Sequence, residues 1–227
     1  MDLNFKESWN RMIKPKICFL IPCYGSVPIE SFQSIINLTS NSASFCNAII
    51  LTSSSCFIHA VRNDLTKRFL ELDKKLNFDF VCWIDSDIVY GWQEVKALID
   101  FIEEKKIDFA TGLYYNFKQN VPVPVVSELL TIDGKTNYYA YKEDQLKDGM
   151  VVDGAGFGFI CMRAKVLKDM AAKYGDFVFW YKGPETGKFI GEDNLFCDRA
   201  KQLGYPLYLC LKANVGHCKT RIIGKVL

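Results

Sequence analysis

The chain has 227 residues, of which 49% are hydrophobic and 14% aromatic, so it is long and apolar enough to bury a sizeable core in one compact domain. Its formal net charge is +2 and its sequence pI is about 8.0. Without a long basic tract, this near balance excludes the electrostatic footprint of a nucleic-acid-binding protein.

The nine cysteines form no CxxC pair, and most lie inside apolar runs. This pattern favours reduced, buried thiols in a reducing compartment over a disulfide framework. Residues 1–16 are polar and charged and contain no apolar signal core. No apolar run reaches the roughly 18 residues that a membrane-spanning helix needs. We therefore expect a protein without a transmembrane segment that works in the cytoplasm.

The first half of the chain alternates short apolar runs with amphipathic segments. Apolar runs that predict buried strands occupy residues 17–23, 47–52, 80–84 and 107–115. Apolar residues at three- and four-residue steps predict helices over 29–38, 58–72 and 92–102. Strands that are apolar throughout and alternate with helices predict an α/β fold with a mostly parallel sheet covered by helices.

The rhythm changes after about residue 116, where the pattern predicts mixed sheet. A hairpin is expected around Asp133-Gly134, and residues 152–162 read as a glycine-rich turn that enters a strand. A helix over 163–173, a second helix that stops at Gly204 and a last strand over 206–211 follow. These elements can extend the same sheet, so we predict one domain.

Ligands of such sheets bind at the carboxyl ends of the parallel strands. Three polar features fall there: residues 22–25, the segment after Thr52, and Asp85-Ser86-Asp87. Two carboxylates one residue apart repel each other unless a cation or a proton lies between them. A hard divalent cation takes one or two carboxylates and completes its shell with phosphate oxygens. The aspartate pair therefore indicates a metal–diphosphate substrate.

Six motifs occur in a fixed order: Pro22-Cys23-Tyr24-Gly25, Arg62-Asn63, Asp85-Ser86-Asp87, residues 154–158 (GAGFG), Gly191-Glu192-Asp193 and a late His217. Together they resemble a GT-A-fold, family-2-like glycosyltransferase that uses nucleotide-diphosphate sugars, over about residues 16–219. The resemblance implies a Rossmann-like, mixed, mostly parallel sheet in a single catalytic domain of hexosyltransferase type spanning 1–227. Within it, about 16–115 would be the nucleotide-binding half, about 116–219 the acceptor and catalytic half, and 220–227 a flexible basic tail.

The resemblance also implies roles for individual residues. The metal, Mn²⁺ or Mg²⁺, would be held by Asp85, Asp87 and His217, with Asp87 the more direct ligand and Asp85 nearer the ribose. The donor, a UDP- or GDP-linked sugar, would contact Pro22, Tyr24, Arg62, Asn63, Asp85, Ser86, Asp153, Gly154, Ala155, Lys219 and Arg221. His217 also reads as an ordinary structural histidine, and the basic tail as a frayed terminus.

Glu192 and Asp193 would form the catalytic pair at a helix start. Asp193 would take the proton from the acceptor hydroxyl, that of a glycan or another molecule, which inverts the anomeric configuration. Glu192 would contact the sugar or the acceptor. Acidic residues at this position also cap helices and complement the helix dipole, a role compatible with catalysis. Retaining enzymes carry nearby acids too, so the stereochemical outcome stays open.

Two other interpretations compete. A buried strand followed by Asp85-Ser86-Asp87-Ile88-Val89 also fits a haloacid-dehalogenase-like phosphatase with Asp85 as the nucleophile. That motif belongs on the first strand of its fold, whereas two strand–helix units precede it here. The other alternative is a nucleotide-sugar or glycan-binding domain that has the fold but no turnover.

Overall fold

The computed structural model describes residues 14–23, 25–119, 121–181 and 190–219. Its α-helices are α2 (Ile29–Asn41), α3 (Ile58–Leu76), α4 (Trp92–Lys105), α5 (Ala164–Tyr174) and α6 (Glu192–Gln202), with short 3₁₀ turns at Ser42–Ser44, Glu143–Gln145 and Gly175–Phe177. Its strands are β1 (Lys16–Cys23), β2 (Asn47–Ser54), β3 (Phe80–Ile84), β4 (Ile88–Val89), β5 (Phe109–Leu113), β6 (Tyr115–Lys118), β7 (Val121–Pro124), β8 (Val126–Ile132), β9 (Lys135–Ala140), β10 (Val151–Val152), β11 (Gly154–Ala155), β12 (Phe159–Arg163), β13 (Leu207–Asn214) and β14 (Gly216–His217). Within these described ranges, no helix combines the length and apolar character needed to cross a membrane.

Seven strands form the central sheet in the order β10-β13-β5-β12-β3-β1-β2. β1 pairs in parallel with β2 and β3, and β5 pairs in parallel with β13, which confirms the predicted mostly parallel sheet. β12 runs antiparallel between β3 and β5. Because a strand from the second half of the chain lies between two strands from the first, both halves share one sheet.

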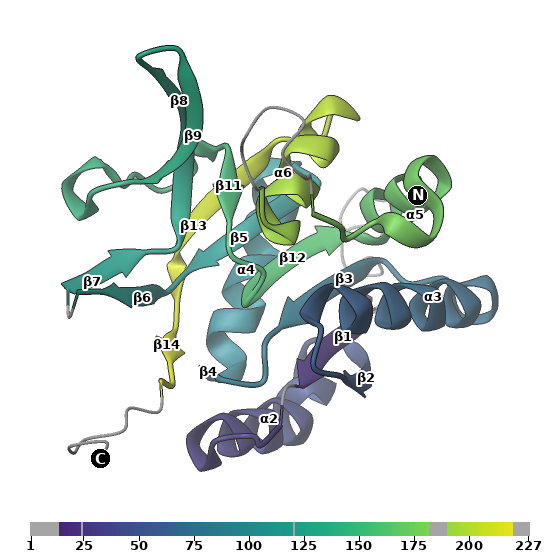
Figure 1. Cartoon of the computed structure of the whole chain (residues 1–227). Coiled ribbons are helices and arrows are strands. Elements are labelled where there is room, and N and C mark those ends of the chain that lie inside the picture. Colours follow the sequence, from purple (N-terminus) through teal and green to yellow (C-terminus); the bar gives the residue numbers. More distant parts are fainter. Residues whose placement is uncertain (1–13, 24, 120, 182–189, 220–227) are drawn as a thin grey trace, which may run out of the picture.

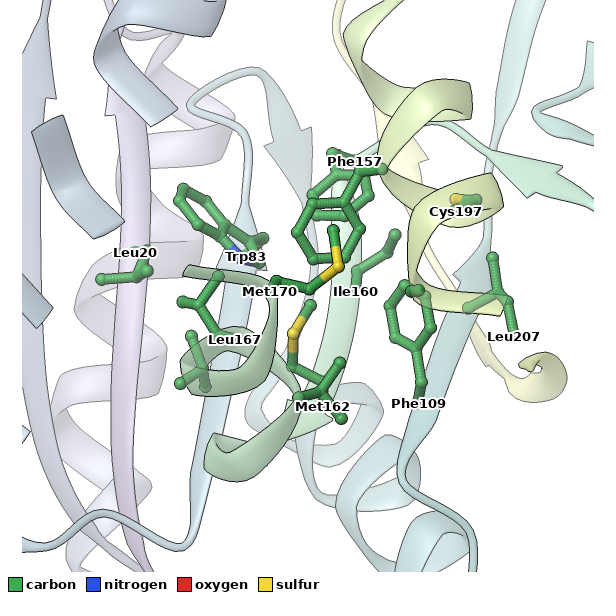
Figure 2. Packing of buried hydrophobic residues seen from close by; sticks show 14 of the residues in the cluster. Leu20, Trp83, Phe109, Phe157, Ile160, Met162, Leu167, Met170, Cys197 and Leu207 are labelled. Carbon is green, nitrogen blue, oxygen red and sulfur yellow. The ribbon is translucent and has the colours of Figure 1, made fainter. Parts of the chain in front are cut away.

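Helices cover both faces of this sheet (Figure 1). Side chains of α2 and α4 pack on one face, and those of α3, α5 and α6 pack on the other. Along β1, Phe19 faces the first layer and Leu20 the second, and both are fully buried. Burial on both faces explains why the inner strands are apolar at every position. Figure 2 shows Trp83, Phe157 and Met170 in the layer formed with α3, α5 and α6.

Local backbone signals set the ends of the elements. α3 continues to Leu76, beyond the predicted end at residue 72, and stops where Asn77 takes a left-handed conformation (φ 51°). The β8–β9 hairpin turns at Asp133 and Gly134, both with positive φ (50° and 69°), as the Asp-Gly pair predicts. This hairpin extends away from the central sheet in Figure 1.

Candidate functional site

The carboxyl ends of β1, β2 and β3 open into one cavity of about 570 Å³, called here the donor cavity after the predicted donor-binding residues in its lining. It is lined by Pro22, Ser26, Pro28, Cys56, Phe57, Ile58, Asp85, Ser86, Asp87, Tyr181, Cys218 and Lys219. The convergence expected from the topology is therefore confirmed. The volume lies within the range of about 300–1,000 Å³ that is usual for small-molecule sites.

Asp87 and His217 are brought together by a short strand pair. β4 and β14 run antiparallel with His217 opposite Ile88, and the Cys218 amide donates a hydrogen bond to the Asp87 carbonyl (2.8 Å). This pairing places His217 Nε2 3.0 Å from Asp87 Oδ2, although 130 positions separate the two residues. The contact depends on strand register.

The hydrogen bonds of His217 define which ring nitrogen can bind a cation. Its Nδ1 lies 3.0 Å from the carbonyl oxygen of Tyr115, which can only accept, so Nδ1 carries a proton. Nε2 is the remaining ring nitrogen, and it faces Asp87 Oδ2 at 3.0 Å. A proton or a cation between these two atoms stabilises the contact. A backbone carbonyl that orients the imidazole in this way is a usual support for a metal-binding histidine.

The spacing of these two atoms suits an octahedral ion. Two adjacent ligands at about 2.1 Å from Mg²⁺ and at right angles are separated by about 3 Å. The 3.0 Å between His217 Nε2 and Asp87 Oδ2 matches that edge. Burial would raise the pKa of the Asp87 carboxyl, but His217 and Lys219 outweigh this effect, and its pKa lies below the ordinary value. The carboxylate is thus held in its charged form.

Asp85 does not join this pair. Arg62 donates to both of its carboxylate oxygens, at 3.0 and 3.3 Å. Across the described part of the chain, no three His, Cys, Asp or Glu side chains gather closely enough to hold a metal ion. The predicted set of Asp85, Asp87 and His217 is therefore divided in this structure, with Asp87 and His217 together and Asp85 bound to Arg62. The guanidinium also occupies both oxygens that the phosphatase interpretation needs for nucleophilic attack.

Arg62 lies beneath the cavity, between two carboxylates. Its side chain is 2% exposed, and its second terminal nitrogen lies 3.6 Å from Asp193 Oδ1. Its guanidinium carbon lies 5.8, 5.4 and 5.8 Å from the ring centres of Trp83, Phe157 and Phe179. Burial disfavours the charged guanidinium, but the two carboxylates reverse the effect and raise the pKa of Arg62. Arg62 thus couples Asp85 to Asp193.

Asp193 lies in the first turn of α6, after the N-cap residue Gly191. Its side chain is 29% exposed, but its Oδ1 is buried without a hydrogen-bond partner. Burial raises the pKa of the Asp193 carboxyl to about 7, an effect opposed by Arg62 and strengthened by Glu192 and Asp85. A carboxyl that titrates near neutral pH can both accept and release a proton under physiological conditions.

The glycine-rich segment 154–158 accommodates buried side chains from neighbouring strands. A Cβ at Gly156 or Gly158 would lie 2.4 or 2.6 Å from the hydroxyl oxygen of Tyr114, and the Gly158 amide donates to that hydroxyl (3.0 Å). The Tyr114 ring also meets the His217 ring edge to face, with centres 5.1 Å apart. Tyr114 therefore joins the glycine segment to the His217–Asp87 pair.

We expect Gly156→Ala to destabilise the fold by about 1–3 kcal/mol, because the new methyl group overlaps the Tyr114 hydroxyl. Adding Tyr114→Phe removes that oxygen, so the double variant should be more stable than the sum of the two single effects, as measured by urea unfolding. Gly191→Ala is the control, since a Cβ there meets nothing within 4 Å. Strict additivity would contradict the proposed steric contact.

A second cavity of about 450 Å³ reaches Asp193 from the β8–β9 side. Its lining includes Phe117, Ser127, Tyr138, Ala155, Gly156 and Asn194. A third cavity, of about 770 Å³, shares Lys118, Tyr138, Ala140 and Asn194 with it and continues along the hairpin. We call the two together the hairpin groove. Asp193 lines this groove, whereas Asp85 and Asp87 line the donor cavity.

Several residues expected to touch the donor have other contacts here. Asn63 forms two hydrogen bonds with the backbone of Phe179. Its Nδ2 donates to the carbonyl oxygen (2.8 Å), and its Oδ1 accepts from the amide (2.9 Å). Asp153 is bound by Lys201 Nζ (2.7 Å) and by the Leu129 amide (2.9 Å). Gly154 packs against Asn194, Ser127 and Tyr138.

These contacts correct the expectation that Arg62, Asn63, Asp153, Gly154 and Ala155 face the donor: none of them is in the described lining of the donor cavity, and Ala155 lines the hairpin groove. Arg62 is too deeply buried to reach the donor, and both polar ends of Asn63 are used by Phe179. Tyr24 and Arg221 lie outside the described residues.

Three other predicted residues line the donor cavity, and Glu192 contacts a residue of its lining. Pro22, Ser86 and Lys219 line the donor cavity, and Lys219 Nζ lies 3.1 Å from Asp87 Oδ2. Glu192 shares a hydrogen bond with the side chain of Tyr181, which also lines that cavity.

Phe57, Tyr181 and Tyr114 were not predicted as site residues from the sequence. Phe57 had a signal, since it is a large apolar residue in the polar segment after Thr52. In the structure it is 61% exposed.

Comparison with known proteins gives a fold but no family. No family model matches the chain, and no curated protein matches it. Solved structures of similar fold include the following two. The crystal structure of A197 from STIV is 21% identical with a TM-score of 0.56 and covers 90% of this chain and 86% of that one. The crystal structure of GalNAc-T7 with UDP, GalNAc and Mn²⁺ is 8% identical with a TM-score of 0.54 and covers 90% of this chain and 44% of that one. At these identities the likeness establishes that the fold is similar to that of a GT-A glycosyltransferase.

Proposed function

We propose that this chain is a metal-dependent glycosyltransferase that moves a sugar from a UDP- or GDP-linked donor to a hydroxyl of a glycan or another acceptor, with inversion. The observation that carries the proposal is the Asp87–His217 pair. His217 Nε2 and Asp87 Oδ2 lie 3.0 Å apart, which is the spacing of an octahedral edge, and Asp87 lines a cavity large enough for a nucleotide sugar. The fold supports the same conclusion, since GalNAc-T7, a protein of similar fold, is described with UDP and Mn²⁺.

Asp87 and His217 would hold Mn²⁺ or Mg²⁺, and a bound divalent cation supplies Lewis-acid stabilisation for a departing diphosphate. Lys219 adds a positive charge at the same edge of the donor cavity and would bind phosphate oxygens. Phe57 offers an exposed ring at the cavity wall for the nucleoside. These residues would keep the diphosphate at the carboxyl end of β3.

Asp193 would act as the base. Asp193 lines the hairpin groove, whereas Asp87 lines the donor cavity, and inversion would require an acceptor hydroxyl in the groove to approach the sugar from the face opposite the diphosphate. The hydroxyl proton passes to the Asp193 carboxylate as the new bond forms. Arg62 would fix the orientation of Asp193 through their 3.6 Å contact. Attack opposite the leaving group inverts the anomeric configuration.

The hairpin groove is the proposed acceptor site. Phe117, Tyr138 and Tyr139 give it aromatic surface, while Asn137 and Asn194 give it amide donors and acceptors. Flat apolar surface interleaved with hydrogen-bonding groups suits an acceptor that carries several hydroxyls, such as a glycan. This favours an enzyme over the non-catalytic alternative, since the groove brings a second ligand to Asp193.

Asp87→Ala should abolish metal-dependent donor binding. By calorimetry, wild-type protein should bind UDP or GDP at least about tenfold more tightly with Mn²⁺ than with chelator, and Asp87→Ala should lose that increment. Asp100→Ala, which removes a carboxylate from the α4 surface, is the control and should keep it. Metal-dependent affinity that survives Asp87→Ala would contradict the assignment of Asp87 as a ligand.

A further inference from the structure

Two buried cysteines face each other across neighbouring strands of the central sheet. Cys82 of β3 lies directly opposite Cys161 of β12 in the antiparallel register, and both pack into the same core layer. Their sulfur atoms are 2.7 Å apart. Two sulfur atoms that share no bond repel each other at this separation, so either the side chains move apart or a bond forms.

We propose that Cys82 and Cys161 are an oxidisable pair that forms a cross-strand disulfide inside the sheet. Directly opposed residues of an antiparallel pair have Cα atoms about 4.5–5.5 Å apart. This range lies within the roughly 4.4–6.8 Å found across disulfides. The bond can therefore form without rearrangement of β3 or β12. All nine cysteines lie in the described part of the chain, and these two are the pair whose thiols are in contact.

The reaction needs an external oxidant, for which a small-molecule disulfide or dioxygen is sufficient. Each thiol loses its proton and one electron, and the two sulfurs join. The two electrons and two protons reduce the small disulfide to two thiols, or dioxygen to hydrogen peroxide. Because Cys82 is 3% and Cys161 0% exposed, the oxidant reaches them during folding or local opening. Once formed, the bond is shielded from reductants by the same burial.

The pair lies just below the functional site. Two pairs further along the same register, Ile84 faces Phe159, and the Asp85 amide donates to the Gly158 carbonyl (2.9 Å). A disulfide at this point would join the strand that leads into Asp85 to the strand that leaves the glycine-rich segment. It would close a loop of about 80 residues, for which the entropic stabilisation is large. The inference does not depend on the proposed activity.

A peptide map tests the bond directly. The full chain is incubated with oxidised glutathione near the onset of thermal unfolding, then denatured in iodoacetamide without reductant and digested with trypsin. We expect peptide 76–96, which contains only Cys82, to be linked to peptide 148–163, which contains only Cys161. Seven of the nine cysteines should be alkylated, since two are in the bond. Alkylated Cys82 and Cys161, or a different pairing, would overturn the proposal.

A thermal shift tests its consequence. The oxidised wild-type protein should unfold roughly 5–15 °C above the reduced protein. Cys161→Ala should lose this redox-dependent difference, whereas Cys210→Ala, which removes another fully buried thiol, should keep it. Should Cys161→Ala fail to fold, Cys82→Ala serves the same purpose, and the peptide map needs no variant. Equal melting temperatures of linked and reduced wild-type protein would refute the stabilising role.

Discussion

Asp193→Asn is expected to lower the rate of sugar transfer by about 10²–10⁴-fold and to leave nucleotide binding unchanged. The reason is that an amide cannot take the proton from the hydroxyl of the acceptor. The donor cavity does not include Asp193 in its described lining, so binding and chemistry should separate. Single-turnover transfer measures the first quantity and calorimetry with UDP or GDP and Mn²⁺ the second. Asp176→Asn, an exposed carboxylate that pairs with Lys67, is the control and should transfer at the wild-type rate.

The same variant should alter the pH dependence of stability. The pKa of Asp193 is about 7 in the folded protein, against an ordinary value of 3.8. The folded state binds this proton more tightly, so its contribution to stability is complete below about pH 4 and is lost as the pH rises through 7. The stability gain from Asp193→Asn should therefore be larger at pH 8 than at pH 5.

The rate of sugar transfer by the wild-type protein should decrease below about pH 7, because Asp193 is then protonated. If Asp193→Asn transferred sugar at the wild-type rate, or if its stability gain did not depend on pH, the proposed role of Asp193 would be contradicted.

Arg62→Met should destabilise the fold by about 3–5 kcal/mol, the largest effect on stability that we expect from a single substitution here. Methionine fills much of the space among Trp83, Phe157 and Phe179, so the cost arises mainly from the loss of positive charge between Asp85 and Asp193. Urea unfolding at pH 8, above the pKa of about 7 of Asp193, gives the value.

Two further variants separate charge from packing. Arg68→Met, on the same helix but with an exposed guanidinium, should cost less than about 1 kcal/mol. Combining Arg62→Met with Asp193→Asn should recover part of the loss, since one of the two unpaired carboxylates is removed. Equal costs for Arg62→Met and Arg68→Met would show that Arg62 does not balance these charges.

The fold could be predicted from sequence because its signals are local and repeated. Strands such as β3 are apolar at every position, and helices such as α3 carry one apolar stripe, so the elements and the layered architecture follow from burial. The Asp133-Gly134 turn was equally readable, because positive φ favours those residues. The predicted end of α3 was four residues too early, because the helix ends where Asn77 takes a left-handed conformation.

The candidate site was predicted less completely. Pro22 near the end of β1 and Asp87 shortly after β3 both line the donor cavity, because the sheet fixes where its strands end. Arg62 and Asn63 were expected at the ligand. Their positions in a helix do not indicate whether the side chains reach the cavity or support it from below. The structure shows that Arg62 is buried, so it supports the cavity from below. Tyr114 gave no signal, since it lay inside the strand predicted over residues 107–115.

The sequence by itself determined that the chain forms a layered α/β sheet and that an acidic pair follows its third strand. The reason is that the spacing of apolar residues and the order of the strands can be read from short stretches of sequence. Only the tertiary structure decided which of these side chains contact one another. The register of β4 with β14 joined Asp87 to His217, the burial of Arg62 joined Asp85 to Asp193, and the insertion of β12 placed Cys161 against Cys82. The physical reason is that each contact joins residues far apart in the chain, and a shift of one residue in register would turn the side chain to the other face.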